Sequence, residues 1–430
     1  MIVEIEKLVQ GGYGLARQDG RTIFVRGAIP GETVEVVIGQ THKHYQEAVM
    51  KRVVETSSDR VSAPCPVYGE CGGCQLQHIG YDAQLRLKRE MLLETLARVG
   101  KVALPEISPI IPSTQIYGSR SVVRFGVLKQ GTGLALGFHR ESSHALVPVT
   151  DCLVLPDILR NIVTGLSKRL ANVSKPPCRI ESIEIRLSST FGQAVLSLRS
   201  QARSKRQAEI LFGLCAKIPG VVGCIVMGTA AVRNARWVHG QEWIAERLDD
   251  MVVRISDQSF LQSNWPVNRA LSDLLIEWVA PAAGLRVLEL YAGVGTLGLP
   301  LAKRGAFVTF VEGNRVALAD ARRAANGNHV GRCRFRPVAA ETFLVTATPG
   351  EYDVVLVDPP RTGLRQEVLS GVLQLEAPRI VYVSCDPATL ARDVARLASS
   401  GYRVTRVQAF DMFPQTSHLE TVTELQRSPR

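Results

Sequence analysis

Short runs of alternating apolar and polar residues dominate the first 56 positions, and glycine-containing turn signals separate them. Runs of this kind are typical of β-strands with one buried face. Four or five strands in so short a segment predict a small OB-like β-barrel, a fold that offers a platform for nucleic acid. A barrel with a purely structural role would show the same pattern. The predicted strands are Ile2–Leu8, Thr22–Val25, Thr33–Ile38 and Glu47–Val54.

From about residue 250 the pattern changes to apolar strands that alternate with helical stretches. This alternation predicts an α/β, Rossmann-like domain with a mostly parallel, doubly wound sheet. Ligands of such sheets bind beyond the carboxyl ends of the strands, so the residues that follow each strand are the most informative. The strands concerned are predicted at Arg286–Leu290, Phe307–Glu312, Val354–Asp358 and Ile380–Ser384.

Between these two parts, a helical pattern over Tyr81–Val99 is followed by a series of strands and turns. A polar segment after the barrel marks the first boundary. The helix, at about 77–104, could pack against the Rossmann-like part. We predict three domains: the barrel over 1–56, a central α+β domain with a cysteine cluster over 57–248, and the Rossmann-like domain over 249–430.

The composition of the 430 residues, 46% hydrophobic and 21% charged, is that of an ordinary globular protein. Lys and Arg number 51 against 40 Asp and Glu, and the net charge of +11 suits a polyanionic partner, although some proteins are merely basic. No apolar run approaches the roughly 20 residues of a membrane span, and the amino-terminal sequence does not resemble a signal peptide. We therefore expect a cytoplasmic protein that does not bind membranes.

The loop after the first of the later strands, Y-A-G-V-G-T-L-G, predicts a nucleotide-containing cofactor. Gly293 and Gly295 let the backbone turn tightly and approach a ligand, and Glu312 at the end of the next strand could hold a ribose diol. The loop alone fits a dinucleotide or S-adenosylmethionine. Glu289 can face the amino group of a sulfonium cofactor, and the D-P-P-R motif that begins at Asp358 has no place in hydride transfer. Both features favour S-adenosylmethionine.

Cys385 follows the fourth strand and precedes a helix that Asp386 and Pro387 predict to begin at once. The positive end of a helix lowers the pKa of a thiol below its free value of about 8.5, so we expect a nucleophilic thiolate. A buried, inert cysteine is the alternative. One such cysteine beside a methyl donor suggests attack on a pyrimidine, because addition at carbon 6 of uracil makes carbon 5 nucleophilic.

The reaction also needs a base that removes the carbon-5 proton, so that the cysteine can be expelled. Glu420, between a turn and the predicted final strand Thr421–Leu425, is the candidate. Without the cysteine, a solvated glutamate would be the simpler interpretation.

A second group of cysteines comprises Cys65, Cys71 and Cys74, with Cys152 as a plausible distant partner. In a chain without an export signal, such clustering indicates metal binding rather than disulfides. Four thiolates suit either zinc or a [4Fe–4S] cluster, and their spacing leaves that choice open. The other cysteines stand singly in apolar surroundings and are expected in the core: Cys178, Cys215, Cys224 and Cys333.

Over nearly the whole chain, the order of these motifs resembles the RNA uracil-C5 methyltransferase family, in the branch with a TRAM domain and an iron–sulfur cluster that acts on 23S ribosomal RNA. G-Y-G-L-A-R with F-V-R-G-A-I-P-G-E looks like a TRAM domain, an OB-like RNA-binding barrel. C-P-V-Y-G-E-C-G-G-C-Q-L-Q-H with C-L-V-L-P looks like the cluster site. The motifs F-L-Q-S-N, D-P-P-R, S-C-D-P-A-T-L-A-R-D and H-L-E-T complete the set.

The resemblance implies roles for individual residues. Cys385 would be the nucleophile, Glu420 the base, and Asp358 a residue that serves both the cofactor and the uracil. Phe260 would stack on a flipped base, and Arg120 would contact the RNA. The cysteine group would hold a [4Fe–4S] cluster. The implied contacts to S-adenosylmethionine are Gln262, Tyr291, Thr296, Glu312 and Asp358.

Two segments depart from the family pattern. V-A-A-E at 338–341 lacks the polar residue that usually contacts the adenine, and Ser119 and Ser121 replace a Tyr and an Asn beside Arg120. The first departure puts the adenine contact in doubt, and the second the details around Arg120.

Other functions fit the sequence less well. Bacterial tRNA uracil-C5 methyltransferases typically lack the TRAM and cluster segments. An RNA cytosine-C5 methyltransferase would need a second cysteine where Pro360 stands, and an amino-group methyltransferase an aromatic residue in place of Arg361. A non-catalytic RNA-binding factor would not need the intact site. The prediction is a monomeric enzyme that methylates carbon 5 of a uridine in 23S rRNA.

Overall fold

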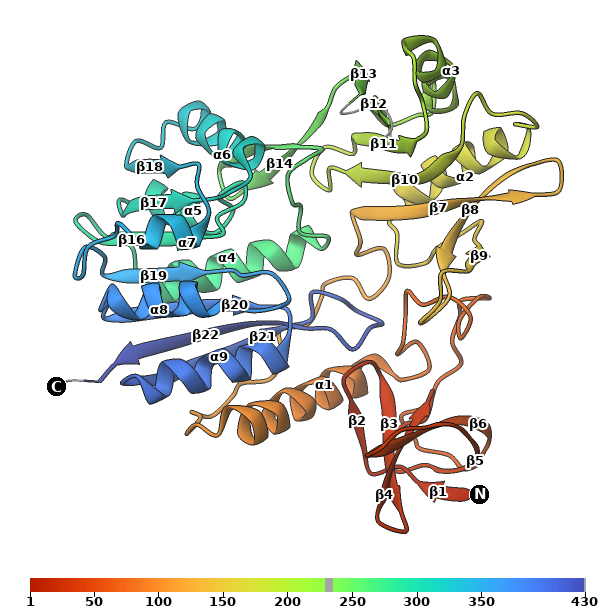
Figure 1. Cartoon of the computed structure of the whole chain (residues 1–430), viewed down its shortest axis with the longest axis horizontal. Coiled ribbons are helices and arrows are strands. Elements are labelled where there is room, and N and C mark those ends of the chain that lie inside the picture. The colour runs from red at the N-terminus through yellow and green to blue at the C-terminus, as the bar shows by residue number, and fades with distance from the viewer. Residues whose placement is uncertain (229–234, 429–430) are drawn as a thin grey trace.

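The computed structural model describes residues 1–228 and 235–428. Residues 2–55 form a curved six-stranded sheet in the order β1-β5-β6-β4-β3-β2 (Figure 1). Apolar side chains from alternate strand positions, among them Val3, Ile23 and Val34, fill the inside of the curve. The strands are β1 (Ile2–Glu4), β2 (Lys7–Val9), β3 (Tyr13–Gln18), β4 (Arg21–Arg26), β5 (Thr33–Thr41) and β6 (Tyr45–Glu55).

The central part is built on a seven-stranded sheet in the order β13-β12-β11-β10-β7-β8-β9, and helices α2 and α3 share an apolar core with it. The segment over 56–80, which carries three of the clustered cysteines, has no regular helix or strand. The elements are β7 (Val122–Gln130), β8 (Gly133–His139), β9 (Leu146–Pro148), α2 (Asp157–Ala171), β10 (Ile180–Leu187), β11 (Ala194–Ser200), α3 (Lys205–Cys215), β12 (Val221–Gly228) and β13 (Arg236–Gly240).

The last part confirms the predicted α/β fold. Its seven strands run in the order β18-β17-β16-β19-β20-β22-β21, and the first five of these are parallel. Strand β22 is antiparallel to both of its neighbours. The four predicted parallel strands match the structure to within one residue at each end, and the predicted final strand, Thr421–Leu425, ends two residues before β22 does. The strands are β16 (Arg286–Leu290), β17 (Phe307–Val311), β18 (Cys333–Arg336), β19 (Val354–Val357), β20 (Arg379–Ser384), β21 (Tyr402–Phe410) and β22 (Glu420–Arg427).

Helices cover both faces of this sheet (Figure 1). One face packs against α4 (Trp265–Val279), α5 (Gly298–Lys303) and α6 (Arg315–Gly327). The other packs against α7 (Ala340–Leu344), α8 (Gln366–Gln374), α9 (Pro387–Ser399) and α1 (Tyr81–Thr95), which continues as a π-helical turn over Leu96–Gly100. No helix in the described part of the chain is long and apolar enough to cross a membrane.

A hairpin joins the central and last parts. Its strands, β14 (Trp243–Leu248) and β15 (Met251–Ser256), pair with each other, and their apolar side chains join the core on the α4 face of the last sheet. The domain boundary predicted at residue 248 therefore falls in the turn of this hairpin.

Candidate active site

A cavity of about 570 Å³ lies at the carboxyl edge of the parallel sheet. Tyr291 follows β16, Glu312 follows β17, Asp358 follows β19 and Cys385 follows β20, and all four line the cavity. Parallel pairing in register brings these strand ends side by side. Glu420, the first residue of β22, lines the same cavity. The other predicted site residues on its wall are Phe260, Gln262, Gly293 and Thr296.

Two glycines and one carboxylate stabilise the backbone conformation of the loop after β16. Gly293 and Gly295 have φ of +54° and +79°, and Tyr291 has φ of +61°, a conformation that costs energy for a residue with a side chain. The Glu312 carboxylate accepts hydrogen bonds from the amides of Gly293 (2.9 Å) and Asn314 (2.6 Å), so it braces the loop. Gly295 shapes the turn but does not line the cavity.

Glu289 lies at the wall of this cavity on β16 and is only 2% exposed. Its Oε2 has no hydrogen-bond partner of normal geometry within the described residues. A Cβ at Gly298 would lie 2.1 Å from this oxygen, so the position requires glycine. Burial, and then repulsion from Asp358, raise the pKa of Glu289 well above its usual value. The Gly298 backbone lowers this pKa, but the carboxyl keeps unused acceptor capacity in the cavity, which indicates that a ligand supplies a further donor or a cation.

Asp358 and Glu420 extend this acidic wall. Burial raises the pKa of Asp358 to about 7. Burial, and then the proximity of Asp358, raise the pKa of Glu420 well above its usual value. Ionised carboxylates in one buried cavity repel each other, and a cation bound among them would relieve this repulsion and lower their pKa values. The donor set therefore fits a positively charged ligand.

Cys385 lies between β20 and α9, where the Asp386 side chain caps the helix by accepting a hydrogen bond from the Thr389 amide at 2.9 Å. This helix start is as predicted, but the predicted fall in the thiol pKa is wrong. The pKa of Cys385 rises to about 11, first because the thiol is buried and then because Glu420 and Asp358 repel the thiolate. Burial and these two acids outweigh the positive end of the helix.

Arg361 and Phe413 are among the cavity residues that the predicted set does not include. Arg361 hydrogen bonds to the Cys385 thiol and lowers its pKa, and it is the sole Lys or Arg on the cavity wall in the described part of the chain. Phe413 also lines the cavity, and its ring meets the His418 ring edge-on with centroids 6.1 Å apart. The D-P-P-R motif marks Arg361 in the sequence. Nothing marks Phe413, because its place depends on how the segment before β22 folds.

A buried ion pair from helix α1 holds that segment in place. The Lys88 ammonium lies 2.6 Å from Asp411, and both side chains are fully buried. The Tyr81 hydroxyl donates a hydrogen bond to Asp411 at 2.9 Å, and Lys88 also donates to the backbone carbonyl of Phe413 at 3.2 Å. A helix from the first quarter of the chain thus positions the residues that lead to Glu420.

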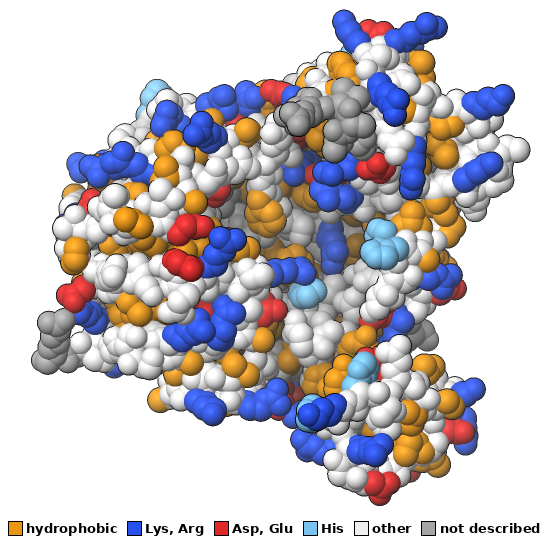
Figure 2. All heavy atoms as spheres, viewed as in Figure 1, with side chains coloured by type: hydrophobic (Ala, Val, Ile, Leu, Met, Phe, Trp, Pro, Cys, Tyr) orange, Lys and Arg blue, Asp and Glu red, His pale blue; other side chains and the backbone are white. Residues whose placement is uncertain are grey.

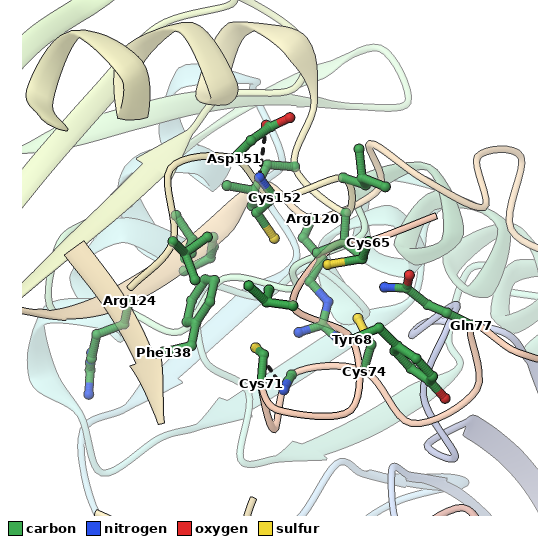
Figure 3. Close-up of a pocket in the computed structure, with 18 residues that line it drawn as sticks. Cys65, Tyr68, Cys71, Cys74, Gln77, Arg120, Arg124, Phe138, Asp151 and Cys152 are labelled. Atoms are coloured by element: carbon green, nitrogen blue, oxygen red, sulfur yellow. Dashed lines mark hydrogen bonds between the residues drawn. The ribbon is translucent and has the colours of Figure 1, made fainter. Parts of the chain in front are cut away.

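The predicted metal ligands line a separate cavity of about 260 Å³ (Figure 3). Figure 3 shows the thiols of Cys65, Cys71, Cys74 and Cys152 arranged around this space. Among the described residues, no three His, Cys, Asp or Glu side chains form a group that could hold a metal ion. Of the cysteines expected in the core, Cys215 and Cys224 are buried, whereas Cys178 and Cys333 are half-buried.

The two residues predicted to contact RNA occupy different places. Phe260 lines the active-site cavity and is 69% exposed, so its ring is accessible for stacking. Arg120 instead lines the cysteine cavity, where its guanidinium lies among the thiols (Figure 3). Its Nε is buried and has no hydrogen-bond partner among the residues that the structure describes. The RNA contact of Arg120 stays a prediction, and the structure gives its side chain different neighbours.

Comparisons with known proteins show which proteins this chain is similar to. A family model described as tRNA (Uracil-5-)-methyltransferase matches residues 224–428. A 23S rRNA (uracil(1939)-C(5))-methyltransferase of Pseudomonas putida is 35% identical over 98% of this chain and 92% of its own length. An uncharacterized RNA methyltransferase of Halalkalibacterium halodurans is 32% identical over 99% of this chain and 96% of its own.

A solved structure extends the similarity to the whole fold. The Pyrococcus abyssi tRNA (uracil-54, C5)-methyltransferase, in complex with S-adenosyl-L-homocysteine, matches with a TM-score of 0.76 and 26% sequence identity. The match covers 99% of this chain and 100% of that chain. With relatives above 30% identity over nearly their full lengths, the chain belongs to the RNA uracil-C5 methyltransferase family and is an enzyme of the methyltransferase class.

Proposed function

We propose that this enzyme transfers a methyl group from S-adenosylmethionine to carbon 5 of a uridine in 23S ribosomal RNA. The observation that carries the proposal is the single acid-lined cavity in which Cys385, Glu420 and the glycine loop meet. The assignment to 23S rRNA rests on the names of relatives such as the Pseudomonas putida enzyme. Transfer RNA is the second candidate, because the archaeal tRNA enzyme has a similar fold over the whole chain.

The residues present fit S-adenosylmethionine. Glu312, held by two backbone amides, would bind the ribose hydroxyls beside the loop. The buried carboxyls of Glu289 and Asp358 would face the positively charged groups, which explains why an unpartnered acceptor is kept in the cavity. When bound, S-adenosylmethionine supplies a methyl group activated by its sulfonium sulfur.

Cys385 would start the reaction by adding to carbon 6 of the uracil ring. The sulfur forms a bond to carbon 6, and the electron pair of the C5–C6 double bond moves into an enolate. Carbon 5 of the enolate then forms a bond to the methyl carbon, whose bond to sulfur breaks. Arg361 favours the thiolate, but burial and the two neighbouring acids still hold the thiol pKa at about 11, so a cation bound among those acids would have to favour the thiolate further.

Glu420 would complete the reaction as the base. It removes the proton from carbon 5, the C5–C6 double bond re-forms, and the sulfur of Cys385 leaves carbon 6. Burial makes the Glu420 carboxylate a stronger base than an exposed glutamate, since its pKa is raised well above the usual value. Asp358 on the same wall can serve both the cofactor and the uracil.

Two variants test this division of labour. Cys385→Ala should abolish methyl transfer, because carbon 5 is not activated, but should retain cofactor binding. Glu420→Gln should still form the adduct and transfer the methyl group, but the cysteine cannot leave, so methylated RNA stays bound to the protein. A denaturing gel should show this complex as a slower band, and the double variant should lack it. Free turnover by Glu420→Gln, or activity of Cys385→Ala, would contradict the mechanism.

The substrate is tested by mapping 5-methyluridine in the total RNA of cells with and without the gene. Loss of one site in 23S rRNA would support the proposal, whereas loss confined to transfer RNA would establish the second candidate.

We also propose that the cysteine cavity holds a [4Fe–4S] cluster. All four predicted ligands line one cavity, and a cluster of four irons and four sulfides holds its ligands farther apart than a single ion does. Burial raises the pKa of Cys152 to about 12, and it also raises the pKa of Cys71. Arg120 opposes these shifts, so the cavity contains a cation that favours thiolates.

The curved amino-terminal sheet would act as a TRAM-like RNA-binding domain. Figure 2 shows Lys and Arg side chains spread over the barrel and the other two parts of the molecule, around a hollow at its centre. A net charge of +11 supports contact with phosphates along such a face. Phe260, which is exposed beside the active site, would contact the target base.

A further inference from the structure

A second cavity, of about 250 Å³, adjoins the active site. Tyr291, Glu312 and Pro360 line both cavities, so the two meet at the carboxylate assigned to the ribose. A nucleoside whose ribose lies at Glu312 has its sulfur-bearing arm on one side and its base on the other. Since Cys385 and the acidic wall occupy the first cavity, the base must lie in the second.

The second cavity offers few groups that could recognise a base. Val311, Gly313, Ala339 and Ala340 present only apolar side chains or none. Adenine carries an exocyclic amino group that donates hydrogen bonds, and leaving such a donor without an acceptor costs binding free energy. An acceptor must therefore come from elsewhere on the wall.

Glu341 supplies a carboxylate at this wall. It lies in the first turn of α7, lines the second cavity, and accepts a hydrogen bond from Arg365 at 3.2 Å. The Arg365 side chain is 75% exposed and that of Glu341 37%, so their ion pair adds little to stability but holds the carboxylate beside the cavity. Its charge also reaches Tyr291, whose pKa rises to about 12 through burial first and Glu341 second.

We propose that Glu341 accepts a hydrogen bond from the 6-amino group of adenine and makes the enzyme prefer adenine over a 6-oxo purine. Glu341 would thus take the place of the polar residue that usually contacts the adenine and that the V-A-A-E segment at 338–341 lacks at the usual position. This inference rests on the proposed use of S-adenosylmethionine. The hydroxyl of Thr362, which lines the same cavity, is the competing acceptor.

Calorimetry on the full chain, without RNA, tests the inference with two ligands. These are S-adenosylhomocysteine and S-inosylhomocysteine, which carries an oxygen in place of the 6-amino group. The wild-type protein should bind the amino compound about tenfold or more tightly. Glu341→Ala should lower the affinity for the amino compound by about tenfold and leave the affinity for the oxo compound unchanged. Glu341→Gln, whose amide can donate to the oxygen, should remove or reverse the preference.

Three further variants make the result decisive. Glu367→Gln, on an exposed carboxylate in the first turn of α8 that lines neither cavity, should change nothing. Arg365→Gln keeps the acceptor but removes the side chain that holds it, so it should reduce the preference less than Glu341→Ala does. Three results would overturn the inference. In Glu341→Ala, the affinity for both ligands falls equally. In Glu341→Gln the preference for the amino compound survives, or in Thr362→Val that preference is lost. A wild-type protein that binds neither ligand would overturn the proposed cofactor itself.

Discussion

The reactivity of Cys385 depends on three neighbours that lie far from it in the sequence. Glu420 and Asp358 disfavour the thiolate, and Arg361 favours it. Local features, namely a strand end and a capped helix, correctly predict where the thiol lies. They do not predict its pKa, because that depends on burial and on charges from two other loops.

Removal of the Arg361 charge should slow the reaction of the thiol. The thiolate is the reactive form, so alkylation of Cys385 should accelerate as the pH rises towards a pKa of about 11. Arg361→Gln should raise that pKa further and make alkylation about tenfold slower at any pH below it. The rate is measured by mass spectrometry of the Cys385 peptide after iodoacetamide treatment. Arg365→Gln serves as the control, and an unchanged pH profile in Arg361→Gln would exclude this role.

Other site residues differ in how far the sequence reveals them. Asp358 and Glu312 were predictable, because each directly follows an apolar strand and such ends meet at one edge of a parallel sheet. Phe413 and Glu341 were not, because their places depend on side chains from other elements. Arg120 lies in an irregular segment, and its position among the thiols follows from no local pattern.

At the scale of elements, a single carboxylate ties three strands together. Glu424 on β22 is fully buried and accepts hydrogen bonds from Arg379 of β20 (2.6 Å) and Arg406 of β21 (2.8 Å). Burial alone would raise its pKa, but Arg406, Arg379 and Thr405 lower it to about 2. These ion pairs connect β22 to both of its antiparallel neighbours, and β22 is the strand that begins with Glu420.

The pH dependence of stability should report on this carboxylate. A lowered folded-state pKa stabilises the protein above the unfolded value of about 4.5, and the contribution is lost as the pH falls towards 2. Glu424→Gln should therefore cost roughly 2 to 3 kcal/mol at neutral pH, allowing for the half-exposed arginines, and little near pH 2. Urea unfolding at several pH values measures the difference. Glu277→Gln, on the exposed face of α4, is the control, and a cost independent of pH would contradict this origin.

The elements themselves were largely predictable where burial sets a simple pattern. Strand β16 was predicted to the residue, because a strand buried on both faces appears as a short apolar run between turn signals. The packing of α1 against the segment that follows β21 was less accessible. It depends on Lys88 meeting Asp411, more than 300 positions away, and such a buried pair leaves no mark in the local sequence.

At the scale of the whole molecule, the cysteine segment joins the three parts. The amides of Gln75 and Leu76 donate hydrogen bonds to the carbonyl of Gln415, in the segment that leads to Glu420. The amide of Gly72 donates to His139 at the end of β8. A cofactor that fixes this segment would therefore fix the parts relative to one another.

Metal content should distinguish the four cavity cysteines from the others. Protein purified without oxygen should be brown and carry about four irons, and Cys152→Ser should lose the iron and the colour. Cys178→Ser, whose thiol lies outside the cavity, should keep both. Because the segment joins three parts, iron loss should also increase proteolysis within 56–80. A colourless protein with one zinc, or iron that survives in Cys152→Ser, would contradict the cluster.

The role of the curved amino-terminal sheet is best tested through its charges. Deletion of residues 1–56 should weaken RNA binding and spare cofactor affinity, but Leu8 and Ile29 share a small core with α1, so the cut also exposes apolar surface. Neutralising the exposed Arg21, Lys43 and Lys51 together avoids this problem.

If these three side chains contact phosphates, the triple Gln variant should bind RNA more weakly. The slope of the logarithm of the binding constant against the logarithm of the salt concentration should become shallower by about 2 to 3. Affinity for S-adenosylhomocysteine should stay unchanged, because the residues proposed to bind the cofactor lie in the last part of the chain. The control replaces Lys205 and Arg206, which are exposed at the start of α3. Equal effects of the two variants would mean that diffuse charge attracts the RNA, and no effect of the triple variant would leave the barrel with a structural role.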